Sequence, residues 1–214
     1  MRRFGLTIDS PMGAEVATAD ERIVRASATE HPDLFWGLRG GGGNFGVVTE
    51  FEFALHELTA LVVLGMFHPL EAAAAVLGRG RDAMGAAGAP DALLWTSFLR
   101  KAPPLPWVPE ELVGRPGVMS LVEWSGEPAS GTELLAAIAA EPRPLASSLA
   151  LTPFLEIQTM TDEIFAHGTR TYIKAGFARE LTPALIDALS AHGAAVGSEL
   201  SHRLPAQPEH SAVM

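Results

Sequence analysis

Short alternating runs of apolar and polar residues fill the first part of the chain. Two of them, Glu15–Ala19 and Arg22–Ala26, flank the polar pair Asp20-Glu21. Short β-like runs joined by so few polar residues are typical of a β-hairpin. We therefore predict two paired strands here, followed by the elements that the next residues indicate.

A helix and a further strand are expected on either side of a run of glycines. Pro32 suits the first turn of a helix, and Gly40 suits the left-handed cap that ends one. The alternation that follows the glycines predicts a strand, with Phe51, Phe53 and Leu55 on its buried face.

From residue 61 onward, runs that fit strands alternate with amphipathic runs that fit helices. The predicted strands are Leu61–Phe67, Ala92–Leu99, Val118–Trp124 and Thr171–Phe177, and the predicted helices are 71–87, 131–140 and 183–192. Leu149–Met160 fits either a helix or a strand. The pattern predicts one α+β domain over Leu61–Leu189, with an antiparallel sheet that helices cover on one face.

The glycine-rich segment Gly41–Gly46 matches the spacing G-x-G-x-x-G. A nicotinamide-dinucleotide loop needs a strand before it and a helix after it, whereas here a predicted helix precedes and a predicted strand follows. No Gly-Lys-Ser or Gly-Lys-Thr follows either, so a Walker loop is excluded. Four glycines in succession lose much conformational entropy on folding. They indicate backbone that passes close to a flat or bulky group, with a simple helix cap and tight turn as the alternative.

Charge and composition exclude several classes of protein. Lys+Arg 15 against Asp+Glu 25 gives a net charge of −10, which leaves no basic surface for nucleic acid. With no cysteine there is no disulfide, thiolate metal site or cysteinyl cofactor link. The apolar run Leu58–Phe67 is shorter than the roughly 20 residues of a membrane-spanning helix. The first residues lack the apolar stretch of a signal peptide, so we expect a cytoplasmic protein.

Within Glu15–Leu55, the segments His31–Trp36 and Arg39–Thr49 closely resemble a known cofactor domain. It is the FAD-binding, PCMH-type domain of berberine-bridge-enzyme-like oxidases, which are FAD-linked oxidoreductases of the vanillyl-alcohol-oxidase superfamily. A looser resemblance to the substrate domain of that family covers Ala102–Pro104, Pro109–Leu112 and Tyr172–Phe177. The resemblance implies an α+β flavoprotein in which a partial FAD-binding subdomain precedes a substrate domain with a helix-covered antiparallel sheet.

The resemblance also implies how the chain is divided. Residues 1–58 would be the C-terminal part of an FAD-binding domain, 59–200 an α+β substrate-type domain, and 201–214 a disordered tail. The match is truncated at both ends, so we expect the family's pyrophosphate loops, its flavin-linking histidine and its C-terminal segment to be missing. That last segment often supplies a catalytic tyrosine. Tyr172, the only tyrosine here, matches a substrate-domain strand instead, and no catalytic residue is named.

In this family the glycine-rich turn and the strand after it line the FAD site, largely through backbone groups. The resemblance therefore gives these predicted cofactor-binding residues: Gly41, Gly42, Gly43, Asn44, Phe45, Gly46, Val47, Val48 and Thr49. Leu34, Phe35 and Trp36 are expected to pack a short helix. Arg39 suits either a phosphate or the end of the helix dipole. Lys174 is expected to face solvent, with a place near the flavin as the alternative.

Three interpretations of function remain open. The chain is an incomplete FAD-dependent oxidase, in which a small alcohol, sugar or amine gives a hydride to flavin; or a small-ligand-binding module; or a degenerate remnant without activity. Without the pyrophosphate loops, we expect FAD to bind weakly or not at all. The expected partners are a small-molecule substrate and a second copy, through an exposed edge of the FAD-binding part. The seven histidines lack the spacing of a metal site.

Overall fold

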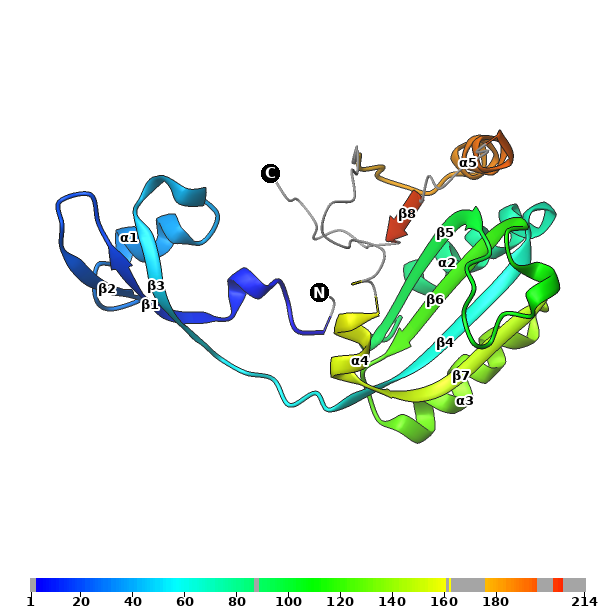
Figure 1. Ribbon diagram of the computed structural model, residues 1–214, viewed down its shortest axis with the longest axis horizontal. Coiled ribbons are helices and arrows are strands. Elements are labelled where there is room, and N and C mark those ends of the chain that lie inside the picture. The colour runs from blue at the N-terminus through cyan, green and yellow to red at the C-terminus, as the bar shows by residue number, and fades with distance from the viewer. Residues whose placement is uncertain (1–2, 87–88, 161, 163–175, 196–201, 206–214) are drawn as a thin grey trace. The chain divides into compact units, whose positions relative to one another are not determined.

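The computed structural model describes residues 3–86, 89–160, 162, 176–195 and 202–205. It divides into two compact units, Met1–Glu57 and Leu58–Met214 (Figure 1). Each unit is built around its own antiparallel sheet. No helix among the described residues is long and apolar enough to span a bilayer.

The first unit is a three-stranded sheet with one short α-helix. Its elements are η1 (Thr7–Asp9), β1 (Pro11–Ala17), β2 (Ile23–Ser27), α1 (Pro32–Leu38), η2 (Gly42–Asn44) and β3 (Val47–Phe53), where η marks a 3₁₀ turn. The strand order is β2-β1-β3, and both pairs are antiparallel. The predicted hairpin is confirmed: the Thr18 N–H donates to the carbonyl of Arg22 over 2.9 Å, and Glu21 takes the left-handed conformation that closes the turn.

The core of the first unit is small. Four apolar residues are buried together, and they are Ala14, Val16, Ala26 and Phe35. The prediction of a buried face on the third strand is wrong in part, because the side chains of Phe51 and Leu55 are 56% and 90% exposed. Trp36 does not pack the helix as expected either, with 79% of its side chain exposed. The helix α1 has only seven residues, so it leaves Phe51 and Leu55 largely uncovered, and Trp36 lies on the side of α1 that faces away from the sheet.

The described residues of the second unit form a five-stranded sheet and four α-helices. The strands are β4 (Ala60–Pro69), β5 (Leu93–Lys101), β6 (Pro116–Trp124), β7 (Ala146–Pro153) and β8 (His202–Pro205); the helices are α2 (Ala73–Gly85), α3 (Pro128–Ala140), α4 (Phe154–Thr159) and α5 (Pro183–Ala195). Two 3₁₀ turns, η3 (Leu70–Ala72) and η4 (Glu110–Leu112), complete the list. The order is β7-β4-β6-β5-β8, with every pair antiparallel. The predicted α+β class is confirmed.

One face of the larger sheet carries the main core. Alternate residues of β4, β5 and β6 point to this face, where α2 and α3 cover them and Leu189 of α5 packs alongside (Figure 1). The cluster includes Val62, Leu64, Trp95, Val122 and Leu135. The only polar side chains buried here among the described residues are those of Ser97, Ser120 and His68. The helix-covered sheet therefore forms as the periodicity predicts.

A loop crosses the opposite face of the same sheet. The segment between β5 and β6 is closed by two hydrogen bonds, from Ala102 N–H to the Arg115 carbonyl and from Gly114 N–H to the Ala102 carbonyl. Trp107 of this loop lies on Gly65, where a Cβ atom would come within 2.8 Å of the indole ring. Phe67 and the loop form a second, smaller core. The lack of a side chain at Gly65 in β4 therefore leaves the space that the Trp107 ring of the loop occupies.

The elements predicted after residue 148 agree with the structure in some places and differ from it in others. The ambiguous segment Leu149–Met160 divides between β7 and α4, and α5 begins as predicted, with Leu185 N–H bonded to the Thr182 hydroxyl over 3.3 Å. Within the segment 201–214, for which a disordered tail is predicted, residues His202–Pro205 form β8, which pairs with β5. Backbone pairing there depends on a partner strand about a hundred residues away, which local periodicity does not reveal. Of the predicted strand Thr171–Phe177, residues 171–175 lie outside the described part.

Candidate functional site

The glycine-rich segment forms a turn between α1 and β3. A helix precedes it and a strand follows, so it lacks the strand-to-helix order of a nicotinamide-dinucleotide loop. Gly41 N–H donates to the Gly37 carbonyl over 2.8 Å, which extends the end of α1. The Asn44 side-chain amide then donates to the Gly41 carbonyl over 2.7 Å and closes the turn. The turn is therefore held by its own polar groups.

The glycines of the turn have different roles. A Cβ at Gly41 would lie 2.4 Å from the Phe45 ring, and one at Gly46 would lie 2.4 Å from the Ala17 carbonyl oxygen. Gly46 also has φ +137°, and Gly42 has φ +69°, which favour glycine whatever the space around them. Only Gly43 combines an ordinary φ with open surroundings, since nothing lies within 4 Å of its Cβ direction. Packing and backbone conformation within the unit thus explain most of the glycines in this turn. Only at Gly43 is there room for a ligand to approach the backbone closely.

The remaining predicted residues separate along β3. Val47 is 69% exposed, whereas Val48 packs against the small core. Thr49 turns to the other side of the sheet, where its hydroxyl donates to the Glu15 carboxylate over 2.6 Å. The ring of Phe45 lies against Gly37 and Gly41 and so supports the turn. Of the nine predicted residues, Gly42 and Gly43 have the most open space around them, and Val47 has a largely exposed side chain.

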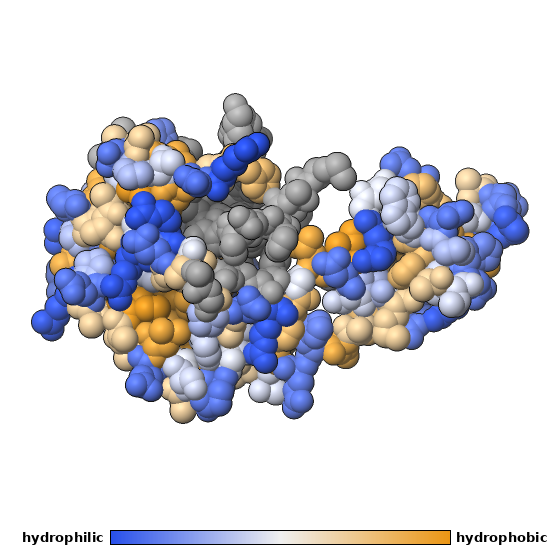
Figure 2. Space-filling view, turned by 180° about the vertical axis from the view of Figure 1, so that it is seen from behind, coloured by the Kyte–Doolittle hydropathy of each residue, from blue (hydrophilic) through white to orange (hydrophobic). Residues whose placement is uncertain are grey.

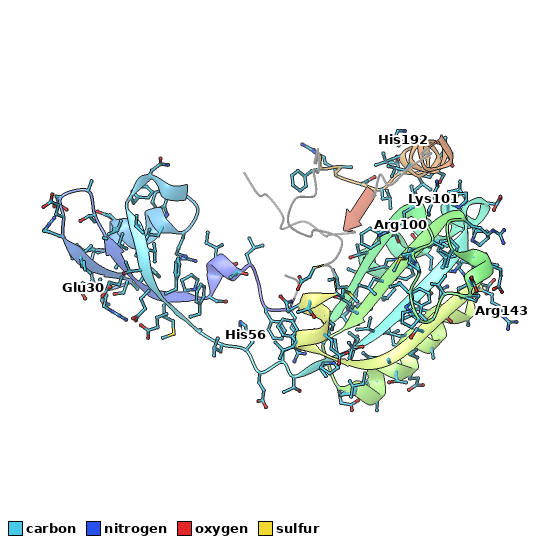
Figure 3. All side chains as sticks on the ribbon, viewed as in Figure 1. Glu30, His56, Arg100, Lys101, Arg143 and His192 are labelled. Atoms are coloured by element: carbon cyan, nitrogen blue, oxygen red, sulfur yellow. The ribbon has the colours of Figure 1, made fainter. Side chains whose placement is uncertain are left out.

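Three arginines of the first unit, Arg22, Arg25 and Arg39, each lie beside an acidic side chain. Arg22 contacts Asp20 at 2.6 Å, Arg25 forms an ion pair with Glu52, and Arg39 lies 3.6 Å from an oxygen of Asp9. The Thr18 hydroxyl and the Arg22 guanidinium lower the pKa of Asp20 below its usual value, so this acid stays charged. Figure 3 draws the side chains of this unit as sticks, with Glu30 and His56 labelled. Each of the three cations therefore has a carboxylate partner within 4 Å.

Arg39 has a local structural role. Its Nε donates to the Ile8 carbonyl over 3.0 Å, and its guanidinium carbon lies 5.8 Å from the centre of the Phe35 ring. These contacts tie α1 to the segment before β1. The two alternatives expected for Arg39 from the sequence, a phosphate ligand and a partner for the helix dipole, stay predictions beside these contacts.

The other candidate side chains do not join this turn. His31 precedes α1 and its Nδ1 lies 2.8 Å from the Arg25 carbonyl oxygen. Lys174 and Tyr172 lie outside the described residues. No group of three or more His, Asp or Glu side chains in the described part of the chain is placed to hold a metal ion.

Sequence analysis missed one buried titratable residue, His68 in β4. Its Nε2 lies 2.9 Å from the Pro142 carbonyl oxygen, and its Nδ1 has no partner among the described residues. Because a carbonyl oxygen only accepts hydrogen bonds, Nε2 must carry the hydrogen. Burial lowers the pKa of His68, while the bond to Pro142 opposes this shift. The signal was present in the sequence, because the alternation through residues 62, 64 and 66 reaches position 68 on the buried face.

In sequence, the chain is similar to sugar oxidases and FAD-linked oxidoreductases. It is 53% identical over 58 residues to a glucooligosaccharide oxidase from Sarocladium strictum, a match that covers 27% of this chain and 12% of the relative. It is 25% identical over 197 residues to an FAD-linked oxidoreductase from Dictyostelium discoideum, covering 89% of this chain and 40% of the relative. No family model matches the chain.

Solved structures share the fold. A 6-hydroxy-D-nicotine oxidase from Arthrobacter nicotinovorans superposes with a TM-score of 0.68 at 24% identity, over 92% of this chain and 42% of that one. A BBE-like protein from Physcomitrella patens superposes with a TM-score of 0.64 at 18% identity, over 89% and 42%. The chain therefore spans about two fifths of these proteins at most.

Proposed function

The homologues of this chain are FAD-linked oxidoreductases, and we propose that it supplies one wall of an FAD site together with the sheet of a substrate domain. In the reaction proposed, a small organic substrate (an alcohol, a sugar or an amine) gives a hydride to the flavin. The chain holds only part of the machinery for this reaction. The first unit would be the C-terminal part of the FAD-binding domain, and the second unit the substrate domain.

The single observation that carries the proposal is the form of the glycine-rich turn. Segment Gly41–Thr49, on which the family resemblance rests, leaves Gly43 open to close approach and Val47 exposed beside it. A glycine has no side chain to offer, so a ligand that lies there is held by main-chain groups and by contact with the flat backbone. This fits the ring systems of FAD, which supply the hydride chemistry when the cofactor is bound.

The same unit does not fit the pyrophosphate of FAD. Arg22, Arg25 and Arg39 are each engaged by an acid, and Glu15 lies on the side of β3 to which Thr49 points. Charge-assisted hydrogen bonds to phosphate contribute about 1.5–3 kcal/mol each. Lacking a few of them moves a nanomolar site towards the millimolar range. The chain by itself is therefore proposed to bind FAD weakly.

Two alternatives remain as second candidates. One is a ligand-binding module without flavin, and the other is a remnant without activity. Both are supported by the fact that Arg22, Arg25 and Arg39 each already contact an acid. Self-association, expected from the sequence, is a further proposal for the surface of this unit. No described residue is proposed as a catalytic base.

Flavin titration of two glycine variants tests the main proposal. Gly43→Val fills the open position, and we expect it to reduce the affinity of the chain for FAD at least tenfold. Gly85→Val at the end of α2 is the matched control, because nothing lies within 4 Å of its Cβ direction either. Fluorescence quenching of added FAD gives both dissociation constants. Equal affinities for wild type and both variants would contradict a cofactor role for the turn.

A further inference from the structure

Strand β7 forms one border of the five-stranded sheet of the second unit (Figure 1). Among the described residues it pairs with β4 alone, so its other side has no strand partner. An unpaired side presents a row of N–H and C=O groups that can pair with another extended chain. Charged residues commonly protect such a side, but β7 contains none, and its one proline is the last residue. The outer side of β7 can therefore take a further strand.

The register of β4 and β7 shows which backbone groups of β7 point outward. The Phe154 N–H donates to the Thr59 carbonyl over 2.9 Å, and this bond continues the antiparallel register of the two strands. In an antiparallel pair, successive residues turn their N–H and C=O groups alternately toward the partner strand and away from it. The even-numbered residues of β7 therefore face β4. The residues that direct their N–H and C=O groups outward are Ser147, Leu149 and Leu151.

The side chains along this border are apolar and partly exposed. Leu149 is 37% exposed and Leu151 is 58% exposed. Exposed apolar side chains are common on protein surfaces, and Figure 2 shows several between polar ones on one face of this molecule. Those of β7 differ because they lie beside outward backbone groups on a strand without charge. The edge strands of the first unit, in contrast, carry charges, Arg25 in β2 and Glu50 in β3.

A second copy of β7 complements this border. Two copies related by a two-fold axis pair antiparallel, and an axis at Leu149 places Leu149 opposite Leu149 and Ser147 opposite Leu151. All three outward residues of each strand then exchange main-chain hydrogen bonds, and no charge within β7 meets a like charge.

The charges that flank β7 also favour this arrangement. Arg143, which is exposed and labelled in Figure 3, precedes the strand, and the exposed Glu156 follows it in α4. Antiparallel pairing brings the Arg143 end of one strand to the Glu156 end of the other. Opposite charges therefore meet at both ends of the paired strands.

We propose that β7 is the contact surface for a second copy of this chain, and that the two sheets join there into one antiparallel sheet with Leu149 on the two-fold axis. The inference concerns the second unit, so it is separate from the flavin site proposed at Gly41–Thr49 and from self-association through the first unit. The interface is built on one pair of strands, and the net charge of −10 on each copy opposes association. A weak dimer is therefore expected, with a dissociation constant of about 10–100 µM.

Sedimentation equilibrium and amide hydrogen exchange on the full chain test the pairing. We expect a monomer in dilute solution and a dimer at a protein concentration of about 1 mM. The amides of Ser147, Leu149 and Leu151 should exchange more slowly in the concentrated sample by about threefold or more, because the second copy covers them.

Lysine variants show whether β7 is the surface involved. Leu149→Lys should weaken the dimer at least tenfold, because it places two ammonium groups opposite each other. Leu151→Lys should also weaken it. Val113→Lys is the matched control, since Val113 lies in the same unit outside β7 and is 38% exposed. Each lysine reduces the negative net charge, so a weaker dimer cannot result from overall repulsion.

An exchange of charges tests the antiparallel direction. Arg143→Glu should weaken the dimer by about threefold, as expected for an exposed ion pair. Adding Glu156→Arg in the same chain should restore the dissociation constant of the wild type, because the opposite charges then meet with their positions exchanged.

Four results would overturn the proposal. The chain stays a monomer at about 1 mM; Leu149→Lys and Val113→Lys weaken the dimer equally; Val47→Lys in β3 disrupts a dimer that Leu149→Lys leaves intact; or the exchange of charges gives no recovery. Leu151→Lys keeps the test valid if circular dichroism shows that Leu149→Lys does not fold. No flavin is added, so failure here is distinct from failure of the flavin titration.

Discussion

His68 should make the stability of the second unit depend on pH in the weakly acidic range. Its side chain is 1% exposed, its Nε2–H donates to the Pro142 carbonyl, and its Nδ1 faces no partner among the described residues. A proton added at Nδ1 would place a positive charge in this buried position without an acceptor. Burial therefore lowers the pKa of His68, against the smaller opposing effect of the bond to Pro142.

The sign and size of the effect follow from proton linkage. In the unfolded chain His68 titrates near its ordinary pKa of about 6.5. Between that value and the lower folded pKa, the unfolded state binds a proton that the folded state does not. The free energy of unfolding then falls by up to about 1.4 kcal/mol for each pH unit of acidification. Above pH 6.5 the contribution is fully present, and it is lost as the pH falls towards the folded pKa.

The comparison with His68→Gln isolates this term. The glutamine amide keeps a donor for the Pro142 carbonyl but does not titrate, so the other histidines contribute equally to both proteins. Urea unfolding followed by circular dichroism at a series of pH values between about 7.5 and 5 gives both free energies. We expect the difference between wild type and variant to become less favourable to wild type as the pH falls. Parallel curves over this range would refute the reasoning.

Three further predictions concern packing and the turn, each measured by urea unfolding. Gly46→Ala should destabilise the first unit by about 1–3 kcal/mol, because its Cβ would clash with a backbone carbonyl oxygen, whereas Gly43→Ala should change stability by less than about 0.5 kcal/mol. Ser97→Ala should cost about 1–3 kcal/mol, since the buried Trp95 indole N–H donates to that hydroxyl over 3.0 Å; a loss no larger than that of an exposed serine would contradict this. Leu135→Ala in α3, fully buried, should cost about 2–5 kcal/mol, and a smaller loss would mean that the helix–sheet core relaxes into the cavity.

Local patterns determined most of the elements. Local sequence alone predicts the hairpin before residue 28, the helix that begins at Pro32 and the apolar run that forms β4, because each depends on neighbouring residues. The α+β class follows from the order of those elements. The resemblance of the Gly41–Thr49 segment to flavin enzymes is also visible without a structure, because it rests on a contiguous motif. A relative that is named an FAD-linked oxidoreductase agrees with it.

Only the tertiary structure decided what individual side chains do. Periodicity predicted that the Phe51 side chain is buried. Burial also needs an element that covers it, and α1 is too short to do so. The motif made all four glycines look equivalent, whereas the ring of Phe45 and the carbonyl of Ala17 occupy the space beside Gly41 and Gly46 and leave Gly43 open. Several of these outcomes depend on contacts between residues far apart in the chain, such as that of Gly46 with Ala17. Such contacts are fixed by how the elements pack together, which the spacing of residues along the sequence does not specify.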